Sequence, residues 1–199
     1  MQVTELALPG VKIIEPTYFE DYRGYYCETY SQRTLAEYGI TDEFVQDNHF
    51  LSLERGTIRG IHFQNAPYAQ SKLLRCVRGS LLDIAVDLRK GSKTFGKWEG
   101  FYLSAENRSM LYIPKGFAHG FLALEDDTLF SYLCGDRYDP ASDGGIRWDD
   151  PQLAVKWPLE RVERIILSDK DARLPLLAEL IESGNSGGEK GCHIGKTME

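Results

Sequence analysis

Short apolar runs, each ended by a turn signal, cover the chain from about residue 10 to residue 135. Several of them alternate apolar with polar residues, which is typical of strands with one buried face. Turn sequences such as RKGSKTFG, LEDDT and DPASDGG separate them, at close to the roughly 8–12-residue spacing of a sandwich or barrel. The pattern therefore predicts an all-β protein. The strand-like runs are residues 11–16, 25–30, 44–53, 57–64, 72–79, 80–88, 97–104, 109–114, 120–125 and 128–135.

Helical signals are few and short. The segment 31–39 predicts one helix, with Ser31 as its N-cap and Gly39 as its stop. The segment 171–184 predicts a C-terminal helix that begins near Pro175. We therefore expect helices only at the periphery of the β-structure.

The simplest fold consistent with these elements is one domain over residues 1–183, with two sheets arranged as a jelly roll and a few short helices around it. Such a barrel encloses a ligand cavity lined by inward-facing side chains. Residues 184–199 are Gly-rich and polar. They predict a flexible tail, in which Cys192 and His193 have no function.

Charge and composition narrow the class of ligand. The formal net charge of the 199-residue chain is −7, which opposes non-specific binding to nucleic acid or to an anionic membrane. A few local Arg and Lys side chains still attract a small anion at short range. No apolar run reaches the roughly 18 residues of a membrane span, and the first residues lack the features of a signal peptide. We therefore expect a cytoplasmic protein, and its four cysteines, which form no CxxC pair, are expected to be buried free thiols.

The run TIRGIHFQ places polar side chains among core-forming residues. Arg59 and His62 are three positions apart, so strict alternation puts them on opposite faces of the strand. Gly60 permits a bulge that turns both side chains inward. Without a bulge, Arg59 is a surface charge and His62 a core histidine, and both interpretations stay open on this motif alone.

A second histidine follows a turn in IPKGFAHGF. The spacing from Pro114 through Gly116 to His119 is typical of cupins, in which this histidine is often a metal ligand. A catalytic metal usually has three protein ligands, and the stretch His62-Phe63-Gln64 offers a single histidine. Adding His49 gives three histidines in principle, but we expect no metal.

Three further positions carry groups suited to proton transfer. Lys72 begins a strand, Tyr132 lies in an apolar strand, and Asp169, Lys170 and Asp171 lie at a turn. Taken singly, they are also explained as a surface lysine, a core tyrosine and capping residues.

Together these motifs resemble one family. The segments RGIHFQ, QSKLLRCVRGSLLDIAVDLRKGSKTFGKW, LSAEN, IPKGFAHGF, SDGGIRWDDP and LSDKD occur in this order. Over about residues 3–177 the chain resembles the dTDP-4-dehydrorhamnose 3,5-epimerase family. The resemblance implies a cupin-type double-stranded β-helix, or jelly roll. It also implies a cofactor-free epimerase that inverts C3 and C5 of dTDP-4-dehydro-6-deoxy-D-glucose to give dTDP-4-dehydro-L-rhamnose.

The family's reaction removes a proton next to a ketone. It needs a base on one face of the sugar, an acid on the other, and a donor at the ketone oxygen. By resemblance, His62 is the base and Asp171 orients it, while Tyr132 returns a proton from the opposite face. Lys72 stabilises the enolate, and His119 lines the sugar pocket and hydrogen-bonds the substrate.

The resemblance also implies contacts to the rest of the substrate. The guanidinium groups of Arg23 and Arg59 suit a diphosphate, and Tyr138 flanks the nucleotide. In the family, the segment that contains Arg23 and Glu28 reaches across a homodimer interface into the partner's site. The expected substrate-binding residues are Arg23, Glu28, Gln46, Asp47, Asn48, Arg59, His119, Tyr138, Asp143 and Lys170.

Three positions depart from the family's usual pattern. Phe50 stands where Ser is common, Asp143 where Glu is common, and Leu133-Cys134 follow the tyrosine where Lys is frequent. These departures leave the proton-transfer residues intact but bear on base and sugar specificity. The alternatives are an epimerase that acts on one carbon or on another nucleotide-linked keto sugar, a non-catalytic cupin-like sugar-binding protein, and a metal-dependent cupin oxygenase or isomerase.

Overall fold

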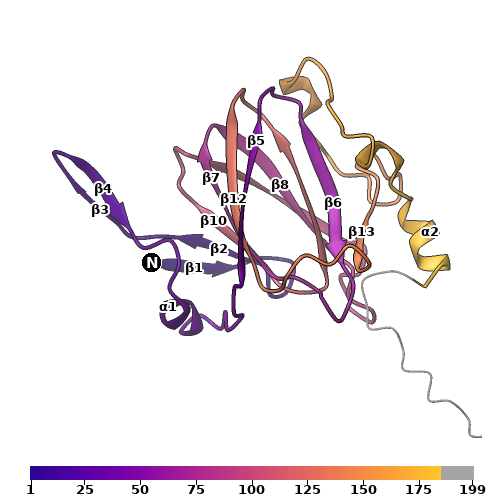
Figure 1. Cartoon of the computed structure of the whole chain (residues 1–199), viewed down its shortest axis with the longest axis horizontal. Coiled ribbons are helices and arrows are strands. Elements are labelled where there is room, and N and C mark those ends of the chain that lie inside the picture. Colours follow the sequence, from indigo (N-terminus) through magenta and orange to yellow (C-terminus); the bar gives the residue numbers. More distant parts are fainter. Residues whose placement is uncertain (185–199) are drawn as a thin grey trace, which may run out of the picture.

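Two antiparallel sheets face each other in the computed structural model, which describes residues 1–184, and a separate hairpin projects from them (Figure 1). The six-stranded sheet has the order β1 (Gln2–Glu5), β2 (Lys12–Glu15), β10 (Met110–Ile113), β7 (Lys72–Arg78), β12 (Thr128–Cys134) and β5 (Gln46–Ser52). The five-stranded sheet has the order β13 (Asp143–Gly145), β6 (Ile58–Gln64), β11 (Phe117–Ala123), β8 (Ser80–Asp87) and β9 (Trp98–Ser104). The hairpin consists of β3 (Tyr18–Asp21) and β4 (Gly24–Cys27). This arrangement confirms the predicted all-β jelly roll.

Each expected strand segment overlaps an observed strand, although β4 and β11 begin before the segments predicted for them. The apolar pattern does not predict β1, β3 or β13, because these strands are short and bury few side chains. The strand β13 falls within the sequence DPASDGG, which predicts a turn. It pairs with β6 instead, with Asp143 opposite Gln64 and Gly145 opposite His62.

The helices lie outside the sheets, as predicted. The helix α1 (Gln32–Ala36) begins after Ser31, whose hydroxyl oxygen accepts a hydrogen bond from the Thr34 N–H at 3.3 Å. The C-terminal segment forms a 3₁₀ turn, η2 (Asp171–Arg173), and then α2 (Leu177–Glu182), after another 3₁₀ turn, η1 (Leu159–Arg161). Residues 185–199, which include the predicted tail with Cys192 and His193, lie outside the described part of the chain.

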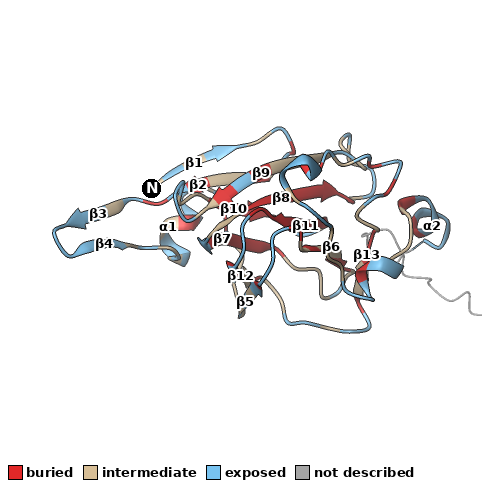
Figure 2. Ribbon diagram, turned by 90° about the horizontal axis from the view of Figure 1, so that it is seen from above, coloured by how far each residue is buried: buried red, intermediate tan, exposed pale blue. Residues whose placement is uncertain are grey.

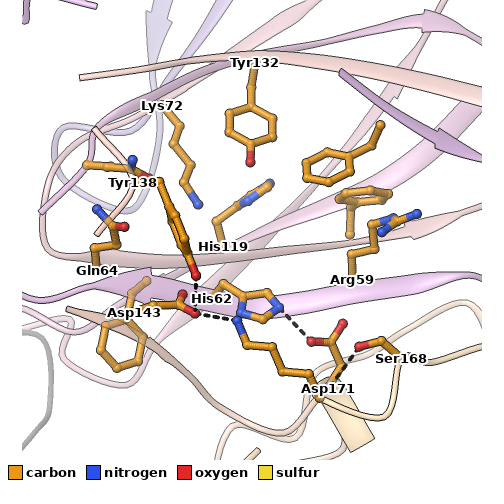
Figure 3. A pocket seen from close by; sticks show the side chains of 15 residues that line it. Arg59, His62, Gln64, Lys72, His119, Tyr132, Tyr138, Asp143, Ser168 and Asp171 are labelled. Carbon is orange, nitrogen blue, oxygen red and sulfur yellow. Dashed lines mark hydrogen bonds and ion pairs between the residues drawn. The ribbon is translucent and has the colours of Figure 1, made fainter. Parts of the chain in front are cut away.

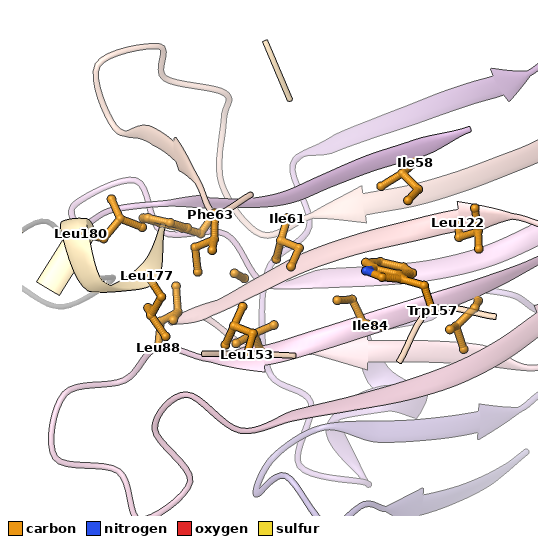
Figure 4. Close-up of a cluster of buried hydrophobic side chains, with 14 of the residues drawn as sticks. Ile58, Ile61, Phe63, Ile84, Leu88, Leu122, Leu153, Trp157, Leu177 and Leu180 are labelled. Atoms are coloured by element: carbon orange, nitrogen blue, oxygen red, sulfur yellow. The ribbon is translucent and has the colours of Figure 1, made fainter. Parts of the chain in front are cut away.

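The strand β8 is buried along almost its whole length (Figure 2), and its side chains belong to two clusters on its two faces. Leu82 and Ile84 belong to a cluster on the face that the C-terminal segment covers, where Trp157 and Leu177 pack against them (Figure 4). Side chains on the other face point between the sheets, because alternate residues of a strand point to opposite faces. They form what we call the interior cluster, which consists of Leu8, Val11, Leu74, Cys76, Leu81, Ala85, Phe101, Leu103, Leu111, Ile113, Phe117, Phe121 and Phe130.

The structure of residues 1–184 also bears on the predicted thiols and on membrane-spanning helices. Cys27 is half-buried, Cys76 and Cys134 are buried, and all three are free thiols. Residues 1–184 contain no helix long and apolar enough to cross a membrane.

Candidate active site

A pocket of about 300 Å³ opens between the two sheets, beside the interior cluster (Figure 3). One wall comes from β6 and β11 of the five-stranded sheet, and the other comes from β5, β7 and β12 of the six-stranded sheet. The lining side chains are Phe50, Arg59, His62, Phe63, Gln64, Gln70, Lys72, His119, Phe121, Tyr132, Tyr138, Asp143, Ser168, Lys170 and Asp171. All four predicted catalytic residues are among them.

A bulge in β6 brings Arg59 and His62 to the same face. His62 lies opposite His119 in β11 while Arg59 lies opposite Phe121, so β6 holds one more residue than β11 over this stretch. Gly60 adopts a φ of +111° within the bulge, a conformation that glycine accepts without strain. Of the two interpretations that the sequence left open, the structure shows the bulge, and both side chains line the pocket.

Replacing Gly60 with alanine should destabilise the fold severely. A Cβ at this position lies 2.8 Å from Gly120 Cα and from the His119 carbonyl oxygen, and backbone strain and overpacking together cost about 3 kcal/mol or more. Gly91→Ala is the matched control, because Gly91 also has a positive φ but has no atom within 4 Å of the added Cβ, so it should cost only about 1–2 kcal/mol. Urea unfolding of the two variants measures the difference. Equal losses of stability would show that the close approach of β6 and β11 carries no penalty.

His62 is held by a buried carboxylate. Its Nε2 lies 2.8 Å from Oδ1 of Asp171, which belongs to η2. The second oxygen of Asp171 accepts from the Gly60 N–H at 3.4 Å. Burial raises the pKa of Asp171, but the hydrogen bond and charge of His62 and the Gly60 N–H outweigh it, so the pKa lies below its usual value. With Nε2 engaged, Nδ1 is the ring nitrogen left to accept a proton.

Tyr132 lies on the wall opposite His62. It comes from β12 in the other sheet, and its hydroxyl points into the pocket (Figure 3). Burial raises the pKa of the phenol well above its usual value. The group therefore keeps its proton at neutral pH and is available as a donor.

Lys72 is the buried cation of the pocket. It begins β7, where it pairs with Cys134 of β12, and its Nζ lies 5.7 Å from the centroid of the Tyr132 ring. Burial lowers the pKa of its ammonium group. Lys72 is therefore not the surface lysine that its position in the sequence also allowed, and a desolvated ammonium group interacts strongly with any negative charge that develops nearby.

His119 lines the same pocket and is paired with Asp83, a residue of β8 that the sequence motifs do not identify. The Nε2 atom of His119 lies 2.8 Å from Oδ2 of Asp83, and both side chains are buried. Burial raises the pKa of Asp83 and lowers that of His119, and the charge of Lys72 lowers the pKa of His119 further. These shifts favour an uncharged pair, in which Asp83 donates to Nε2 and Nδ1 carries the ring proton.

The rim of the pocket holds three of the predicted substrate-binding residues. The hydroxyl of Tyr138 lies 3.3 Å from Oδ2 of Asp143, and the ammonium group of Lys170 forms an ion pair with the same oxygen. Burial lowers the pKa of Lys170, but the hydrogen bond and charge of Asp143 outweigh burial and raise it. Lys170 and Tyr138 are each about half exposed, so the rim offers a cation and an aromatic face to a ligand.

Gln46, Asp47 and Asn48 do not line this pocket. Gln46 and Asn48 point inward behind the rim, where Gln46 accepts from the Tyr138 N–H at 3.1 Å and donates to Asn48 at 2.9 Å. Asp47 points to the outer face of the sheet, because side chains alternate along β5, and it accepts from the Ser131 hydroxyl at 3.4 Å. Their roles as substrate contacts stay predictions.

Arg23 and Glu28 also lie outside the pocket of their own chain. Arg23 is at the turn of the β3–β4 hairpin, which projects away from the two sheets (Figure 1), and its side chain is 73% exposed and ion-paired with Asp21. Glu28 follows the hairpin and accepts from the Thr34 hydroxyl at 3.1 Å.

Several lining residues were not predicted from the sequence. Gln64 is two positions beyond His62, so extending the alternation of β6 by one step would have found it. It anchors the rim, because its amide nitrogen donates to the Arg137 carbonyl at 3.0 Å and its oxygen accepts from the Asp139 N–H at 2.8 Å. Gln70 and Ser168 lie in the quoted segments QSKLL and LSDKD, but neither residue was singled out there.

The sequence offers three histidines as candidate metal ligands. Within residues 1–184, no group of three or more His, Cys, Asp or Glu side chains is arranged to hold a metal ion. His49 is exposed on β5, while His62 and His119 are each bonded to a carboxylate. The described histidines therefore do not form the three-ligand set that the sequence left open.

The geometry suits proton transfer on opposite faces of a small molecule. A histidine oriented by a carboxylate lies on one wall, and a protonated phenol faces it from the other. A buried lysine lies beside the phenol. A ketone held between these groups would have a base, an acid and a cation within reach.

Comparison with known proteins gives concordant matches. The family model described as dTDP-4-dehydrorhamnose 3,5-epimerase matches residues 5–179. The dTDP-4-dehydrorhamnose 3,5-epimerase of Methanothermobacter thermautotrophicus is 49% identical over 87% of this chain and 92% of its own length. The crystal structure of dTDP-6-deoxy-D-glucose-3,5-epimerase from Legionella pneumophila, in complex with dTDP-4-keto-L-rhamnose, is 43% identical, with a TM-score of 0.88 over 95% of this chain and 98% of that chain.

A third match has a different printed activity. ChmJ, a 3'-monoepimerase from Streptomyces bikiniensis crystallised with dTDP-quinovose, is 36% identical, with a TM-score of 0.84 over 91% of this chain and 90% of that chain. The fold is therefore shared by proteins described as double and as single epimerases.

Proposed function

Because the chain belongs to the dTDP-4-dehydrorhamnose 3,5-epimerase family, we propose that it inverts C3 and C5 of dTDP-4-dehydro-6-deoxy-D-glucose to give dTDP-4-dehydro-L-rhamnose. The observation that carries the proposal is the His62–Asp171 pair facing the Tyr132 phenol across one pocket. Both carbons flank the 4-ketone, and the ketone acidifies the C–H bond on each side of it. The substrate's own carbonyl thus provides the electron sink, so the proposed reaction uses no cofactor.

The first half-reaction is proton abstraction. Nδ1 of His62 takes the proton from the carbon, and the electron pair of the C–H bond moves into an enolate with the charge on the ketone oxygen. Asp171 stabilises the imidazolium that forms, because its carboxylate holds Nε2 at 2.8 Å. Lys72 stabilises the enolate oxygen, and loss of such a group elsewhere costs about 3–4 kcal/mol of barrier.

The second half-reaction is reprotonation from the opposite face. The Tyr132 hydroxyl donates its proton to the same carbon as the enolate collapses back to the ketone. The carbon is inverted because abstraction and donation occur from opposite walls of the pocket. Proton exchange with solvent then restores neutral His62 and protonated Tyr132, and the same pair acts at the second carbon.

The rim residues suit the nucleotide end of the substrate. Arg59 and Lys170 provide cations for the diphosphate, since a guanidinium fork matches phosphate oxygens. Tyr138, which is 53% exposed, offers a ring face to the base. Asp143 holds both Tyr138 and Lys170 in place.

Product analysis tests the proposed function. The chain is incubated with dTDP-4-dehydro-6-deoxy-D-glucose, the 4-ketone is trapped by a stereospecific reductase, and the sugar is identified by NMR. An L-rhamnose product supports the proposal. A product inverted at one carbon would instead establish a single-carbon epimerase, the second candidate, which the likeness to the 3'-monoepimerase favours.

The alkaline side of the pH profile should report Lys72. Burial lowers the pKa of its ammonium group, so the charge that stabilises the enolate is lost as pH rises through a value below the usual 10.4 or so. Burial raises the pKa of Tyr132, so the phenol stays protonated over the same range. We therefore expect kcat to decline on the alkaline side in the wild type. In Lys72→Arg, which stays charged to about pH 12, kcat should be lower but the decline should move to higher pH. An alkaline decline that is unchanged in Lys72→Arg would assign it to another group.

We also propose that the protein acts as a homodimer in which the β3–β4 hairpin of one chain completes the pocket of the other. The hairpin exposes large aromatic side chains, namely Phe19, Tyr22, Tyr25 and Tyr26. Such a cluster is unusual on a monomer and is typical of an interface. Arg23 lies among them, on a hairpin that projects away from the two sheets, and it does not line the pocket of its own chain, which supports a role in the partner's site.

Mixing two inactive variants tests this arrangement. Arg23→Ala and His62→Ala should each be impaired as homodimers. A mixed dimer should regain activity, because the site with an intact His62 then receives an intact Arg23 from the partner subunit. The measurement is the rate after the two variants are co-refolded, compared with each alone. A mixture no more active than its components would place Arg23 in its own chain's site or outside any site.

A further inference from the structure

Three pocket side chains that come from three different strands, two on one wall and one on the other, pack against one another. The rings of Phe50 in β5 and Tyr132 in β12 are stacked, with their centroids 5.5 Å apart and 22° between their planes. The guanidinium carbon of Arg59 in β6 also lies over the Phe50 ring, 4.9 Å from its centroid. All three side chains line the pocket, so Phe50 contacts both the proposed proton donor and a proposed diphosphate ligand.

Phe50 is the main side chain that packs against both Tyr132 and Arg59. Among residues 1–184, the other aromatic contacts of the Tyr132 ring are tilted or edge-on, to Phe130 and His119. Arg59 has little else to hold it within that range, because its buried Nε has no hydrogen-bond partner and its Nη2 donates only a long bond of 3.4 Å to the Leu51 carbonyl. Removing the Phe50 ring would therefore free both groups.

We propose that Phe50 is a positioning residue that couples diphosphate binding at Arg59 to the placement of the Tyr132 phenol. The inference rests on the proposed epimerase function. A phosphate group that engages Arg59 fixes the guanidinium over the Phe50 ring, and the ring in turn limits the tilt of Tyr132. The phenol then points at the carbon whose proton His62 removes from the other side.

This arrangement separates two steps that a general loss of structure would impair together. Proton abstraction depends on His62 and Asp171, which lie across the pocket from Phe50 and Tyr132. Reprotonation on the opposite face depends on Tyr132. A change at Phe50 should therefore reduce inversion while it spares the exchange of the substrate's C–H protons with solvent.

The experiment compares Phe50→Leu, which keeps apolar bulk but removes the ring, with Phe50→Tyr, which keeps the ring. Leu51→Ala is the control, because Leu51 is the next residue of β5, points to the outer face and is 43% exposed. Each variant is incubated with dTDP-4-dehydro-6-deoxy-D-glucose in deuterated water. The rates of deuterium incorporation and of trapped L-rhamnose formation are measured separately. Binding of dTDP is measured by calorimetry, and thermal melting confirms folding.

In Phe50→Leu we expect the rate of L-rhamnose formation to fall about tenfold or more, because the general acid is misplaced. The rate of deuterium incorporation should stay within about threefold of the wild-type rate. Its affinity for dTDP should fall about threefold to tenfold, as for loss of a cation–π contact. Phe50→Tyr and Leu51→Ala should keep both rates. Equal losses of exchange and inversion in Phe50→Leu, or no loss of inversion, overturn this inference alone. A wild-type chain that exchanges neither carbon overturns the proposed function as well.

Discussion

Replacing His62 with alanine should reduce deuterium incorporation at both C3 and C5 by about 10³-fold, within the range expected for loss of a general base. The reason is geometric, because His62 is the histidine of the pocket whose partner is a carboxylate with a lowered pKa. An ionised Asp171 stabilises the imidazolium that proton abstraction creates. Proton NMR of the substrate in deuterated water measures the effect directly, without any need for a downstream enzyme.

The matched control for His62→Ala is His49→Ala. His49 is exposed on the outer face of β5 and does not line the pocket, so exchange should continue at the wild-type rate. Thermal melting of both variants shows whether the fold is kept. Substantial exchange in a folded His62→Ala protein would show that another base operates, and the remaining pocket histidine, His119, would become the first candidate.

Replacing Tyr132 with phenylalanine should separate the two half-reactions. The variant keeps the ring, and with it the stack on Phe50, but it loses the hydroxyl that donates the proton. We expect exchange to continue within about an order of magnitude of wild type, while inversion falls about 10²-fold or more, the usual contribution of a general acid. The two rates are measured on one sample, as deuterium incorporation and as trapped L-rhamnose.

The control for Tyr132→Phe is Tyr102→Phe. Tyr102 is 54% exposed on the edge strand β9 and lies outside the pocket, so both rates should be unchanged. If Tyr132→Phe formed L-rhamnose at the wild-type rate, the phenol would not be the acid and the opposite wall would need another donor. The lysine beside it, Lys72, is the group that would have to be tested next.

The alternation of apolar and polar residues was enough to predict the longer strands, but strict alternation would have put Arg59 and His62 of β6 on opposite faces. Gly60 between two pocket residues permitted a bulge, because glycine accepts the backbone conformation that a bulge requires, but the motif alone did not decide between a bulge and a regular strand. The short strand β13 could not be predicted in this way, since its three residues are Asp143 and two glycines and its partner is distant in sequence. The local sequence pattern predicts a strand when that strand carries the apolar side chains of a buried face.

The pocket itself depends on contacts between distant residues. Asp171 reaches His62 from a different part of the chain, and at the level of the motif it is equally consistent with a capping residue. Asp83 was visible as a polar residue in an apolar run, but nothing local indicates that it pairs with His119. The resemblance to the family predicted the first pair and did not point to the second.

The measurement that tests the central claim most directly is proton NMR of dTDP-4-dehydro-6-deoxy-D-glucose incubated with the wild-type chain in deuterated water. The account predicts that deuterium enters at both C3 and C5, because one base and one acid on opposite walls serve both carbons beside the ketone. Deuterium at neither carbon, in a folded protein that binds dTDP, would contradict the claim that this pocket removes protons next to the ketone.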